Sequence, residues 1–268
     1  MTMAKRSRLD AELVRRGHAR SRGHAAEIIE NGFVRVAGML ASKAATQVGT
    51  DQPIVVRTPS EEPPYVSRGA HKLIGALDAF DLPVEGRRAL DAGASTGGFT
   101  DVLLRRGAAR VTAVDVGYGQ LAWVLRSNER VTVMERVNVR ELTPEQIEEP
   151  RPDLVVGDLS FISLTLVLDP LRRSVDPAAD FVMMVKPQFE VGKTRVGAGG
   201  VVREPALRAE AVTDVATHAF TLGLGVVDVT ASPLPGPSGN VEYFLWMRSG
   251  AAPLDPDRLE RAIEEGPA

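Results

Sequence analysis

The sequence predicts an α/β protein: a doubly wound, mostly parallel sheet with an antiparallel last strand, preceded by a small α+β module. From residue 68 onward, short apolar runs alternate with helical patterns, which is typical of parallel strands connected by helices. A glycine-rich turn follows the first of these runs. The first sixty residues also differ in charge, with ten Lys and Arg against five acids, a net of +5, whereas the remainder has a net of −8.

Composition limits the class of protein. The 268 residues are enough for one large domain, or for a large and a small one. Hydrophobic residues make up 44% and charged residues 25%, which excludes a wholly disordered chain. No apolar run approaches the roughly 20 residues of a membrane helix, and no apolar segment follows the basic N-terminus as in a signal peptide. Without cysteine, disulfides, thiolate metal sites and cysteine nucleophiles are excluded. We therefore expect a cytoplasmic protein.

Two short helices and then strands are expected in the first sixty residues. Gly17 and Gly32 end the two helices, because glycine tolerates a left-handed conformation, and Ser21 caps the second one. The expected elements are helices at 10–16 and 22–31 and strands at 33–36 and 54–56. Three apolar residues of the first helix are expected to face inward: Ala11, Leu13 and Val14.

Arginines lie along the first helix and in the turn after it. Guanidinium groups pair bidentately with phosphates and displace counterions, so a basic segment on an acidic body predicts contact with a polyanion. A solvated basic face explains the charge equally well. The caps and arginines together resemble the S-four RNA-binding domain over about residues 6–60. The matching string is Arg8-Leu-Asp-Ala-Glu-Leu-Val-Arg-Arg-Gly-His-Ala-Arg-Ser-Arg22, followed by Ala26, Ile29, Gly32, Val34, Val36 and Gly38.

This resemblance implies an RNA-binding domain over residues 1–61. Charged and proline residues then predict a stiff linker, residues 62–67, before a catalytic domain over residues 68–268. The arginines expected to bind RNA are Arg6, Arg8, Arg15, Arg16, Arg20 and Arg22, with Arg68 after the linker.

Seven apolar runs predict the strands of the larger domain. They lie at 89–91, 111–116, 131–134, 154–156, 181–185, 226–229 and 241–247, with a helix through 99–104 after the first. The segment between the last two runs, residues 233–240, is too short for a helix, so these strands are expected to pair antiparallel. A terminal antiparallel hairpin is typical of the Rossmann-like fold of S-adenosylmethionine-dependent methyltransferases rather than of dehydrogenases.

The glycine-rich turn favours the same cofactor. It runs from Asp91 to Phe99 and lacks the G-x-G-x-x-G spacing of dinucleotide sites. Gly93 lets the backbone approach a ligand, Asp91 can accept the ammonium of a methionine, and Asp115 can hold ribose hydroxyls. A lone glycine loop is more often only a turn, but acids at two successive strand ends favour a cofactor site. The expected contacts are Asp91, Gly93, Ala94, Ser95, Thr96, Gly97, Gly98, Phe99 and Asp115.

Four charged residues are expected to meet at the carboxyl edge of the sheet. Lys186 follows a fully apolar strand, and Asp158 ends the neighbouring one. Glu242 opens the last strand, and Lys72 lies early in a helix. In a doubly wound sheet these positions converge on one crevice, where partial desolvation shifts pKa values. The alternative interpretation is a pair of stabilising ion pairs at the sheet edge.

In order and strand context, the four residues match the Lys-Asp-Lys-Glu tetrad of the FtsJ-like ribose 2′-O-methyltransferases. Longer strings resemble the TlyA family over nearly the whole chain. They are Ser67-Arg-Gly-Ala-His-Lys-Leu, Asp91-Ala-Gly-Ala-Ser-Thr-Gly-Gly-Phe-Thr, Asp115-Val-Gly-Tyr-Gly-Gln-Leu, Asp158-Leu-Ser-Phe-Ile-Ser, Lys186-Pro-Gln-Phe-Glu and Pro235-Gly-Pro-Ser-Gly-Asn-Val-Glu-Tyr-Phe-Leu. The resemblance implies methyl transfer from S-adenosylmethionine to the ribose 2′-hydroxyl of cytidine in 16S and 23S rRNA, within the small and large ribosomal subunits. By the same analogy, Asn138 lies near the adenine and Asp158 also contacts the cofactor.

The tetrad suggests a mechanism in which Lys186 approaches the 2′-oxygen and either lowers the pKa of the hydroxyl or accepts its proton. Asp158 holds the amine, while Lys72 and Glu242 orient the ribose. No metal is expected, because no His/Asp/Glu cluster offers a site. Two other classes remain as alternatives: a non-catalytic RNA-binding assembly factor, and a membrane-active haemolysin, the family's other label. The intact tetrad argues against the first, and a mean hydropathy of −0.06 against the second. No oligomeric state is predicted.

Overall fold

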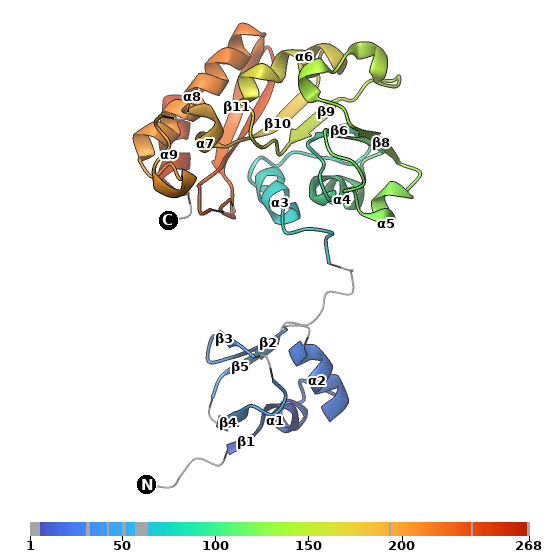
Figure 1. Ribbon diagram of the computed structural model, residues 1–268, viewed down its shortest axis with the longest axis vertical. Helices are drawn as coiled ribbons and strands as arrows, with labels where there is room; N and C mark the ends of the chain where they lie inside the picture. Colours follow the sequence, from blue (N-terminus) through green and yellow to red (C-terminus); the bar gives the residue numbers. More distant parts are fainter. Residues whose placement is uncertain are drawn as a thin grey trace. The chain divides into compact units, whose positions relative to one another are not determined.

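The chain forms two compact units in the computed structural model, residues 1–64 and 65–268 (Figure 1). The structure describes residues 6–30, 33–41, 43–49, 52–56, 64–192, 194–236 and 238–266. The first part of the predicted linker, residues 62 and 63, lies outside these ranges. Tyr65 and Val66, in its second part, belong to the larger unit. Val66 N–H donates to Asp101 Oδ2 at 3.0 Å, and the Arg105 guanidinium lies 4.1 Å from the Tyr65 ring centroid.

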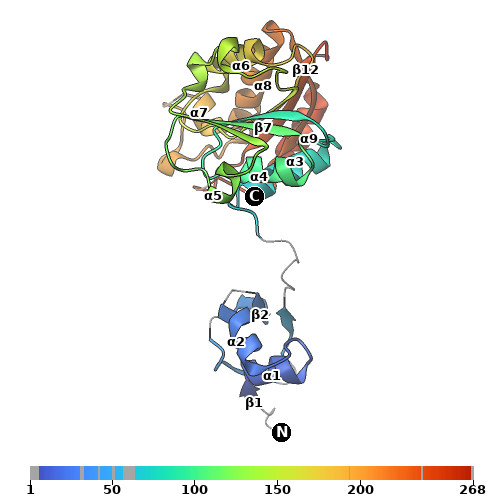
Figure 2. The same ribbon diagram turned by 90° about the vertical axis from the view of Figure 1, so that its right-hand side faces the viewer.

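A seven-stranded sheet forms the centre of the larger unit (Figure 2). In spatial order its strands are β11 (Leu224–Ala231), β12 (Tyr243–Ser249), β10 (Asp180–Val185), β9 (Leu154–Gly157), β6 (Arg88–Ala92), β7 (Arg110–Asp115) and β8 (Val131–Glu135). The strands β10, β9, β6, β7 and β8 run parallel, whereas β12 is antiparallel to both β10 and β11. The predicted fold class and the antiparallel last strand are therefore confirmed.

Helices cover both faces of this sheet. On one face pack α3 (Ala70–Ala79), α4 (Gly98–Arg105) and α5 (Trp123–Arg126). On the other pack α6 (Leu168–Ser174), α8 (Pro205–Thr221) and α9 (Pro256–Glu264), while the short α7 (Pro187–Glu190) contacts α8. Alternate residues of β10 belong to the two cores, with Met183 in one and Val182 and Met184 in the other. Burial on both faces explains why this strand is uniformly apolar.

Four short 3₁₀ helices lie in the connections of this unit. They are η1 (Val139–Glu141), η2 (Pro144–Gln146), η3 (Leu164–Leu166) and η4 (Ala198–Gly200). The last strand begins at Tyr243, so the prediction that Glu242 opens it is wrong by one residue. The Glu242 carbonyl still accepts a hydrogen bond from Ser232 N–H at 2.8 Å, which continues the pairing of β11 with β12 by one residue before β12 begins.

The smaller unit contains α1 (Leu9–Arg15) and α2 (Arg22–Glu30), with two small sheets. One sheet pairs β1 (Arg6–Arg8) with β4 (Gln47–Gly49), and the other has the order β3 (Met39–Leu40), β2 (Val34–Val36), β5 (Ile54–Val56). Both predicted helices and both predicted strands are present. The predicted end of the second helix at Gly32 lies outside the described residues. Strands β1, β3 and β4 were not predicted, because two or three residues carry no alternating pattern.

The buried face of α1 differs from the prediction. Leu9, Asp10, Glu12 and Leu13 are buried, whereas Ala11 and Val14 are only half-buried. The acids can face inward because each pairs with arginines, which compensates the cost of removing a carboxylate from water. The cap assignments hold: Ser21 Oγ accepts from His24 N–H at 3.1 Å, and Gly17 has a φ of +75°.

Within the described ranges, no helix has the combination of length and apolar character needed to cross a bilayer. The same residues contain no group of three or more His, Asp or Glu side chains placed to hold a metal ion.

An ionic network ties four strands together at the edge where the parallel strands begin. The Asp180 carboxylate accepts from Trp246 Nε1 at 2.8 Å and from Arg87 Nη2 at 2.9 Å. Arg87 also pairs with Asp153 at 2.8 Å. Asp180 is almost fully buried, so this network joins the starts of β6, β9 and β10 to β12 at a place shielded from water.

We expect Asp180→Ala to lower the free energy of unfolding by about 2–4 kcal/mol, because it leaves a buried indole N–H and part of a guanidinium without an acceptor. The matched control is Asp169→Ala, whose pair with Arg173 at 3.0 Å is exposed at both ends and should contribute less than about 0.5 kcal/mol. Chemical denaturation followed by tryptophan fluorescence measures both. Equal losses would contradict the assigned role of the network.

Candidate active site

Two adjoining cavities lie at the carboxyl edge of the parallel strands. We call the first the lysine cavity; it has a volume of about 290 Å³ and is lined by Ser67, Arg68, Gly69, Lys72, Gly93, Ala94, Ser95, Thr96, Gly98, Phe99, Asp158, Ser160 and Lys186. The second, the Asp115 cavity, has a volume of about 540 Å³ and is lined by Gly93, Ser95, Asp115, Val116, Gln120, Val137, Asn138, Val139, Asp158, Leu159, Ser160, Phe161, Ile162 and Val167. Four residues line both: Gly93, Ser95, Asp158 and Ser160.

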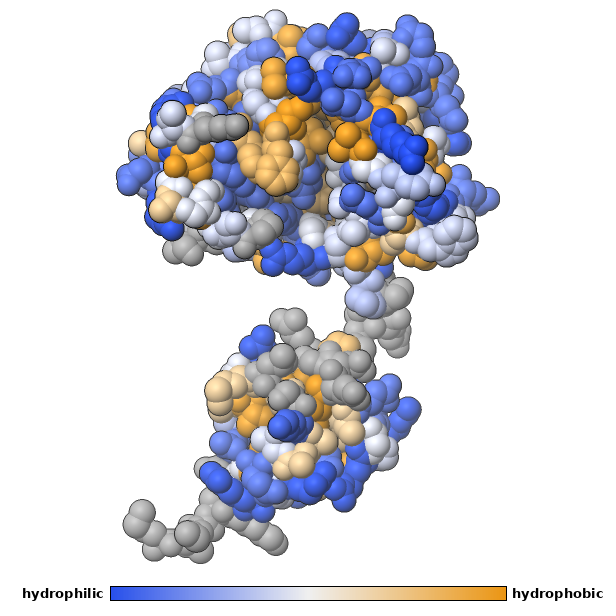
Figure 3. Space-filling model, in the orientation of Figure 1, coloured by the Kyte–Doolittle hydropathy of each residue, from blue (hydrophilic) through white to orange (hydrophobic). Residues whose placement is uncertain are grey.

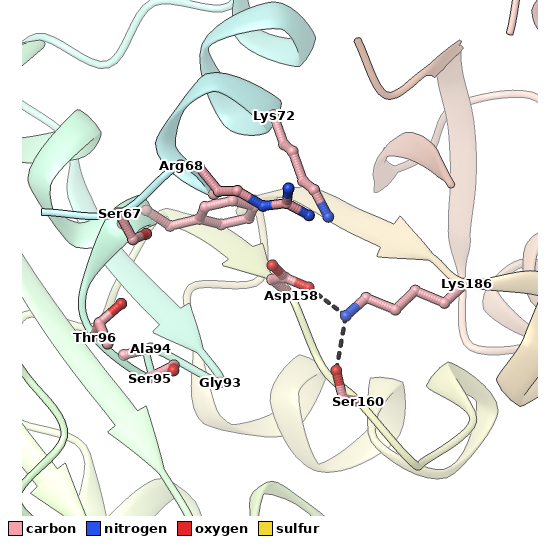
Figure 4. A pocket seen from close by; sticks show the side chains of 13 residues that line it. Ser67, Arg68, Lys72, Gly93, Ala94, Ser95, Thr96, Asp158, Ser160 and Lys186 are labelled. Atoms are coloured by element: carbon pink, nitrogen blue, oxygen red, sulfur yellow. Dashed lines mark hydrogen bonds and ion pairs between the residues drawn. The ribbon is translucent and has the colours of Figure 1, made fainter. Parts of the chain in front are cut away.

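Lys186 lies between two oxygen partners in the lysine cavity (Figure 4). Its Nζ is 2.5 Å from Asp158 Oδ1 and donates to Ser160 Oγ at 2.8 Å. Lys186 follows β10 and Asp158 follows the neighbouring β9, so the parallel pairing of these strands brings the two side chains together. A lysine ammonium has three N–H donors. Ser160 takes one of them and Asp158 is held as an ion pair, so the amine keeps donors for a ligand in the cavity.

Lys72 forms a second, more deeply buried ion pair. Its Nζ is 2.5 Å from Glu242 Oε2, and both residues are at most 5% exposed. Lys72 lines the lysine cavity, whereas Glu242 does not. The structure therefore brings Lys72, Asp158 and Lys186 to one cavity, as predicted, and places Glu242 behind Lys72. The tetrad also forms two ion pairs, so both interpretations made from the sequence describe part of the arrangement.

The glycine loop between β6 and α4 forms the wall shared by the two cavities. Gly93 has a φ of +83°, and a Cβ at this position would lie 3.1 Å from the Asp158 carbonyl oxygen. Glycine is thus required where the loop passes the segment after β9. Gly97 also has a positive φ, +99°, but a Cβ there would meet Leu125 and Leu121, so this glycine serves packing and lines neither cavity.

Asp91 is fully buried beneath this loop and lines neither cavity. Its Oδ2 accepts from Thr100 Oγ1 at 2.7 Å, while its Oδ1 has no hydrogen-bond partner among the described residues. Burial raises the pKa of the Asp91 carboxyl to about 7, and the charge of Asp158 raises it further against the hydrogen bond from Thr100. A buried acceptor without a donor is a costly feature that a positively charged ligand group would relieve.

Asp115 and Asn138 both line the Asp115 cavity. The Asp115 carboxylate is fixed by two backbone donors, Ser95 N–H at 2.7 Å and Gly117 N–H at 2.6 Å. Each oxygen keeps a further lone pair for a hydroxyl. Asn138 precedes η1, and its Oδ1 accepts from Arg140 N–H at 3.2 Å, which orients the side-chain amide.

The lining residues that were not predicted as site residues include Ser67, Gln120, Ser160 and Phe161. Ser160 and Phe161 lie in the string that begins at Asp158, and this position was their only signal. Phe161 is 91% exposed and has a φ of +65°, which is unusual for a bulky residue. Figure 3 shows that apolar side chains reach the surface on one face of this unit.

In the smaller unit, two buried acids hold four of the predicted arginines. Asp10 Oδ2 pairs with Arg8 and Arg22 at 2.9 Å each, and the Arg8 guanidinium in particular holds the pKa of the Asp10 carboxyl well below its usual range. Glu12 pairs with Arg15 at 2.5 Å and with Arg16 at 2.7 Å, and hydrogen bonds from Arg15 and then Arg16 hold its pKa similarly low.

The exposure of these arginines differs. The Arg16 side chain is only 19% exposed, and its guanidinium also donates to the backbone carbonyls of Gln52 and Gly49. Arg6 and Arg20 are exposed, and no side-chain partner for either is found among the described residues. Arg68 belongs to the larger unit and lines the lysine cavity.

Comparisons with known proteins agree with this architecture. Residues 65–249 match the family model described as FtsJ-like methyltransferase, and residues 7–54 match the model described as S4 domain. The chain is 60% identical over 271 residues to "16S/23S rRNA (cytidine-2'-O)-methyltransferase TlyA" of Mycobacterium tuberculosis, covering 99% of this chain and 100% of the relative. It is 38% identical over 238 residues to "Hemolysin A" of Brachyspira hyodysenteriae, covering 88% and 98%.

A solved structure shows the same fold. The crystal structure of "a putative hemolysin from Lactococcus lactis" superposes with a TM-score of 0.72 at 42% identity, covering 75% of this chain and 97% of that one. Together with the two matched family models and the full-length relative, this places the chain in the TlyA family, with an S4 domain followed by an FtsJ-like methyltransferase domain.

Proposed function

We propose that this chain transfers a methyl group from S-adenosylmethionine to the ribose 2′-hydroxyl of cytidine in 16S rRNA, 23S rRNA or both, within ribosomal subunits. The observation that carries the proposal is the Lys186 amine, held by Asp158 and Ser160 in a cavity that adjoins the glycine loop. The relative from M. tuberculosis has this activity in its name. Because the substrate is ribosomal, we place the activity in the cytoplasm.

The described residues fit S-adenosylmethionine. In the proposed site, Asp115 accepts the ribose hydroxyls and Asn138 contacts the adenine. Asp91, buried beneath the glycine loop, attracts the methionine ammonium through its charge and not as a lining residue. Gly93 lets the loop pass close to the segment after β9 where the two cavities meet. When bound, S-adenosylmethionine would supply a methyl carbon that an oxygen nucleophile can attack, with the neutral thioether S-adenosylhomocysteine as the leaving group. The fit needs no metal.

Lys186 acts on the attacking oxygen. A ribose hydroxyl is a weak nucleophile, so the enzyme must align it with the methyl group and ease the loss of its proton. In the ammonium form, a remaining N–H of Lys186 points to the 2′-oxygen and stabilises the negative charge that develops there, and the hydroxyl proton passes to solvent water. In the neutral form, the Lys186 amine accepts the proton itself and then releases it to solvent. Asp158 and Ser160 fix the direction of this amine.

Lys72 and Arg68 provide positive charge on the opposite wall of the lysine cavity (Figure 4). Because Glu242 pairs with Lys72 from behind, Lys72 stays ordered and its remaining donors can contact the ribose. Arg68 is suited to a phosphate of the same nucleotide, since a guanidinium pairs bidentately with phosphate oxygens. These two residues thus position the ribose, and Lys186 carries the chemistry.

The S4 domain supplies recognition away from the reacting atom. Every RNA nucleotide has a 2′-hydroxyl, so the choice of one cytidine requires contacts with the shape and backbone of the surrounding RNA. Within the predicted domain, residues 1–61, five of the predicted arginines are exposed and suited to such contacts: Arg6, Arg8, Arg15, Arg20 and Arg22. Arg16 is the exception, because its hydrogen bonds serve the fold of the domain.

The proposal is tested by incubating the protein and S-adenosylmethionine with unmodified small and large ribosomal subunits and mapping the methyl group to an atom. We expect a cytidine 2′-O-methyl group with the wild-type protein. Lys186→Met should reduce the rate by about 10²–10⁴-fold, the usual contribution of a proton-transfer group, with unchanged cofactor affinity. Ser160→Ala, which removes the hydrogen bond from the amine and leaves its ion pair with Asp158, should have a smaller effect. Full activity of Lys186→Met would refute the role of the lysine. Cofactor binding without methylation of either subunit would point to another RNA.

Cofactor affinity should depend on pH through Asp91. Since the pKa of this carboxyl is about 7 in the free protein, it is neutral below pH 7 and cannot pair with the ammonium. Affinity for S-adenosylmethionine measured by calorimetry should therefore rise with pH up to about 7, by up to roughly tenfold per unit, and then level off. Thr100→Val removes a hydrogen bond that favours the charged form, so the midpoint should move to higher pH. Asp91→Asn should bind weakly at every pH. A pH-independent wild type would rule out this interaction.

Two arginines of the S4 domain should respond differently to replacement by alanine. Arg20→Ala should weaken rRNA binding and reduce the slope of log affinity against log salt concentration by about one, as expected for one lost phosphate contact, with unchanged thermal stability. Arg16→Ala should mainly destabilise the domain, because it removes the hydrogen bonds to Gln52 and Gly49. Filter binding over a salt series and thermal unfolding separate the two effects. The reverse pattern would contradict the assignment.

A further inference from the structure

Glu190 is an acid beside the active site that the mechanism above does not use. It is the last residue of α7, which begins directly after Lys186. Its Oε2 accepts from Ser163 Oγ at 2.5 Å, and its Oε1 accepts from Leu164 N–H at 2.9 Å. Burial raises the pKa of the Glu190 carboxyl, which marks a charge kept in an unfavourable place by specific partners. Glu190 lines neither the lysine cavity nor the Asp115 cavity.

The contacts of Glu190 close a ring that contains the catalytic lysine. From Lys186 the chain runs through α7 to Glu190, whose carboxylate binds Ser163. From Ser163 the chain runs back to Ser160 and Asp158, and both of these residues bind the Lys186 amine. The segment 158–163 is thus held at one end by the amine and at the other end by the Glu190 carboxylate.

The segment needs such an anchor. It has no helix or strand of its own, and it contains Phe161 in a positive-φ conformation that the surrounding structure must maintain. The Phe161 ring lies 5.1 Å, centroid to centroid, from that of Phe189, the residue before Glu190. Leu164 is only 1% exposed, so its buried backbone N–H depends on Glu190 for an acceptor.

A lysine side chain has four rotatable bonds, so only its partners fix the direction of the amine. Both partners of Lys186 lie on the segment that Glu190 anchors. A shift of about 1 Å in a reacting group can lower a rate by a hundredfold. Loss of the anchor would therefore misalign the Lys186 amine with the reacting oxygen, although Glu190 itself is outside the cavity.

We propose that Glu190 is a positioning residue for methyl transfer: through Ser163 and Leu164 it holds the segment that aims the Lys186 amine. This inference rests on the proposed function, because it assigns Glu190 a part in that reaction. The polar cofactor contacts proposed above come from β6, β7 and the segment after β8, whereas the anchored segment supplies part of the wall of the Asp115 cavity. Loss of the anchor therefore reduces turnover more than it weakens cofactor binding.

Steady-state and calorimetric measurements on the full-length protein test this. In Glu190→Ala we expect kcat to fall by about 10–100-fold, with a smaller rise in the Kd for S-adenosylmethionine and a KM for ribosomal subunits within about twofold of wild type. Glu190→Gln keeps an oxygen that accepts from Leu164 N–H, and its amide N–H can donate to Ser163 Oγ, so this variant should recover most of the activity. Glu148→Ala, which removes an exposed acid paired with Arg110, is the control for loss of charge and should behave as wild type.

Ser163→Ala completes a double-mutant cycle with Glu190→Ala. If the two residues act as one anchor, the double variant should be no slower than Glu190→Ala alone, whereas independent roles would give multiplied effects. Wild-type kcat in folded Glu190→Ala, multiplied effects in the cycle, or a loss of cofactor affinity equal to the loss of kcat would each overturn the proposal.

A readout without turnover separates this proposal from the proposed function. In protein labelled with ¹⁵N-lysine, the Lys186 side-chain ammonium signal is assigned by its absence in Lys186→Met. We expect this signal to shift or to exchange faster with water in Glu190→Ala and to stay unchanged in Glu148→Ala. A changed signal in a protein that methylates no rRNA would refute the proposed function and leave the anchor standing. An unchanged signal would overturn the anchor whatever the activity.

Discussion

The parallel pairing of β9 with β10 is the constraint on which the active site depends. It runs from Leu154 opposite Asp180 to Gly157 opposite Met183, and both strands are buried on both faces. A shift of one residue would turn the apolar side chains of either strand to the wrong core, so the register is strongly fixed. Asp158 and Lys186 come just after these strands, and their contact at 2.5 Å is a consequence of that register. The packing of β9 and β10 against the two hydrophobic cores thus positions Asp158 and Lys186, the proposed catalytic pair.

Buried carboxylates have opposite pKa shifts in the two domains, and the difference follows function. In the S4 domain, Asp10 is surrounded by guanidinium groups, which hold the pKa of its carboxyl well below the usual range. In the methyltransferase domain, Asp91 is buried with hydrogen bonds from Thr100, and burial raises the pKa of its carboxyl to about 7. The first arrangement is complete and stabilises a fold. The second lacks a cation, which a ligand can supply, and incomplete arrangements of this kind are typical of binding sites.

The sequence was most informative where burial forces a pattern. Uniformly apolar strands such as β10 were located to within one residue, because a strand buried on both faces admits no polar positions. Caps such as Gly17 were equally clear, since their geometry favours few residue types. The sequence did not predict how deeply each charged residue lies. Glu242, like Asp158, is an acid beside a strand end, yet it pairs with Lys72 and lines neither the lysine cavity nor the Asp115 cavity. Nor could the sequence reveal that Arg16 is held by backbone carbonyls of residues more than thirty positions away.

The two lysines of the site are held by different means, and this matters for how each can change. Lys186 depends on strand register and on the anchored segment after β9. Lys72 depends on a close approach between α3 and the loop after β11, where a Cβ on Gly75 would lie 2.6 Å from Pro233 Cγ. A Cβ on Gly236 would equally lie 2.6 Å from Glu242 Oε1, in a place where that buried side chain has no room to move. Two glycines therefore allow the close packing that brings Lys72 to Glu242, whereas strand register and the segment after β9 set the position of Lys186. Substitutions at the glycines act on the ribose-positioning wall, and substitutions around α7 act on the chemical step.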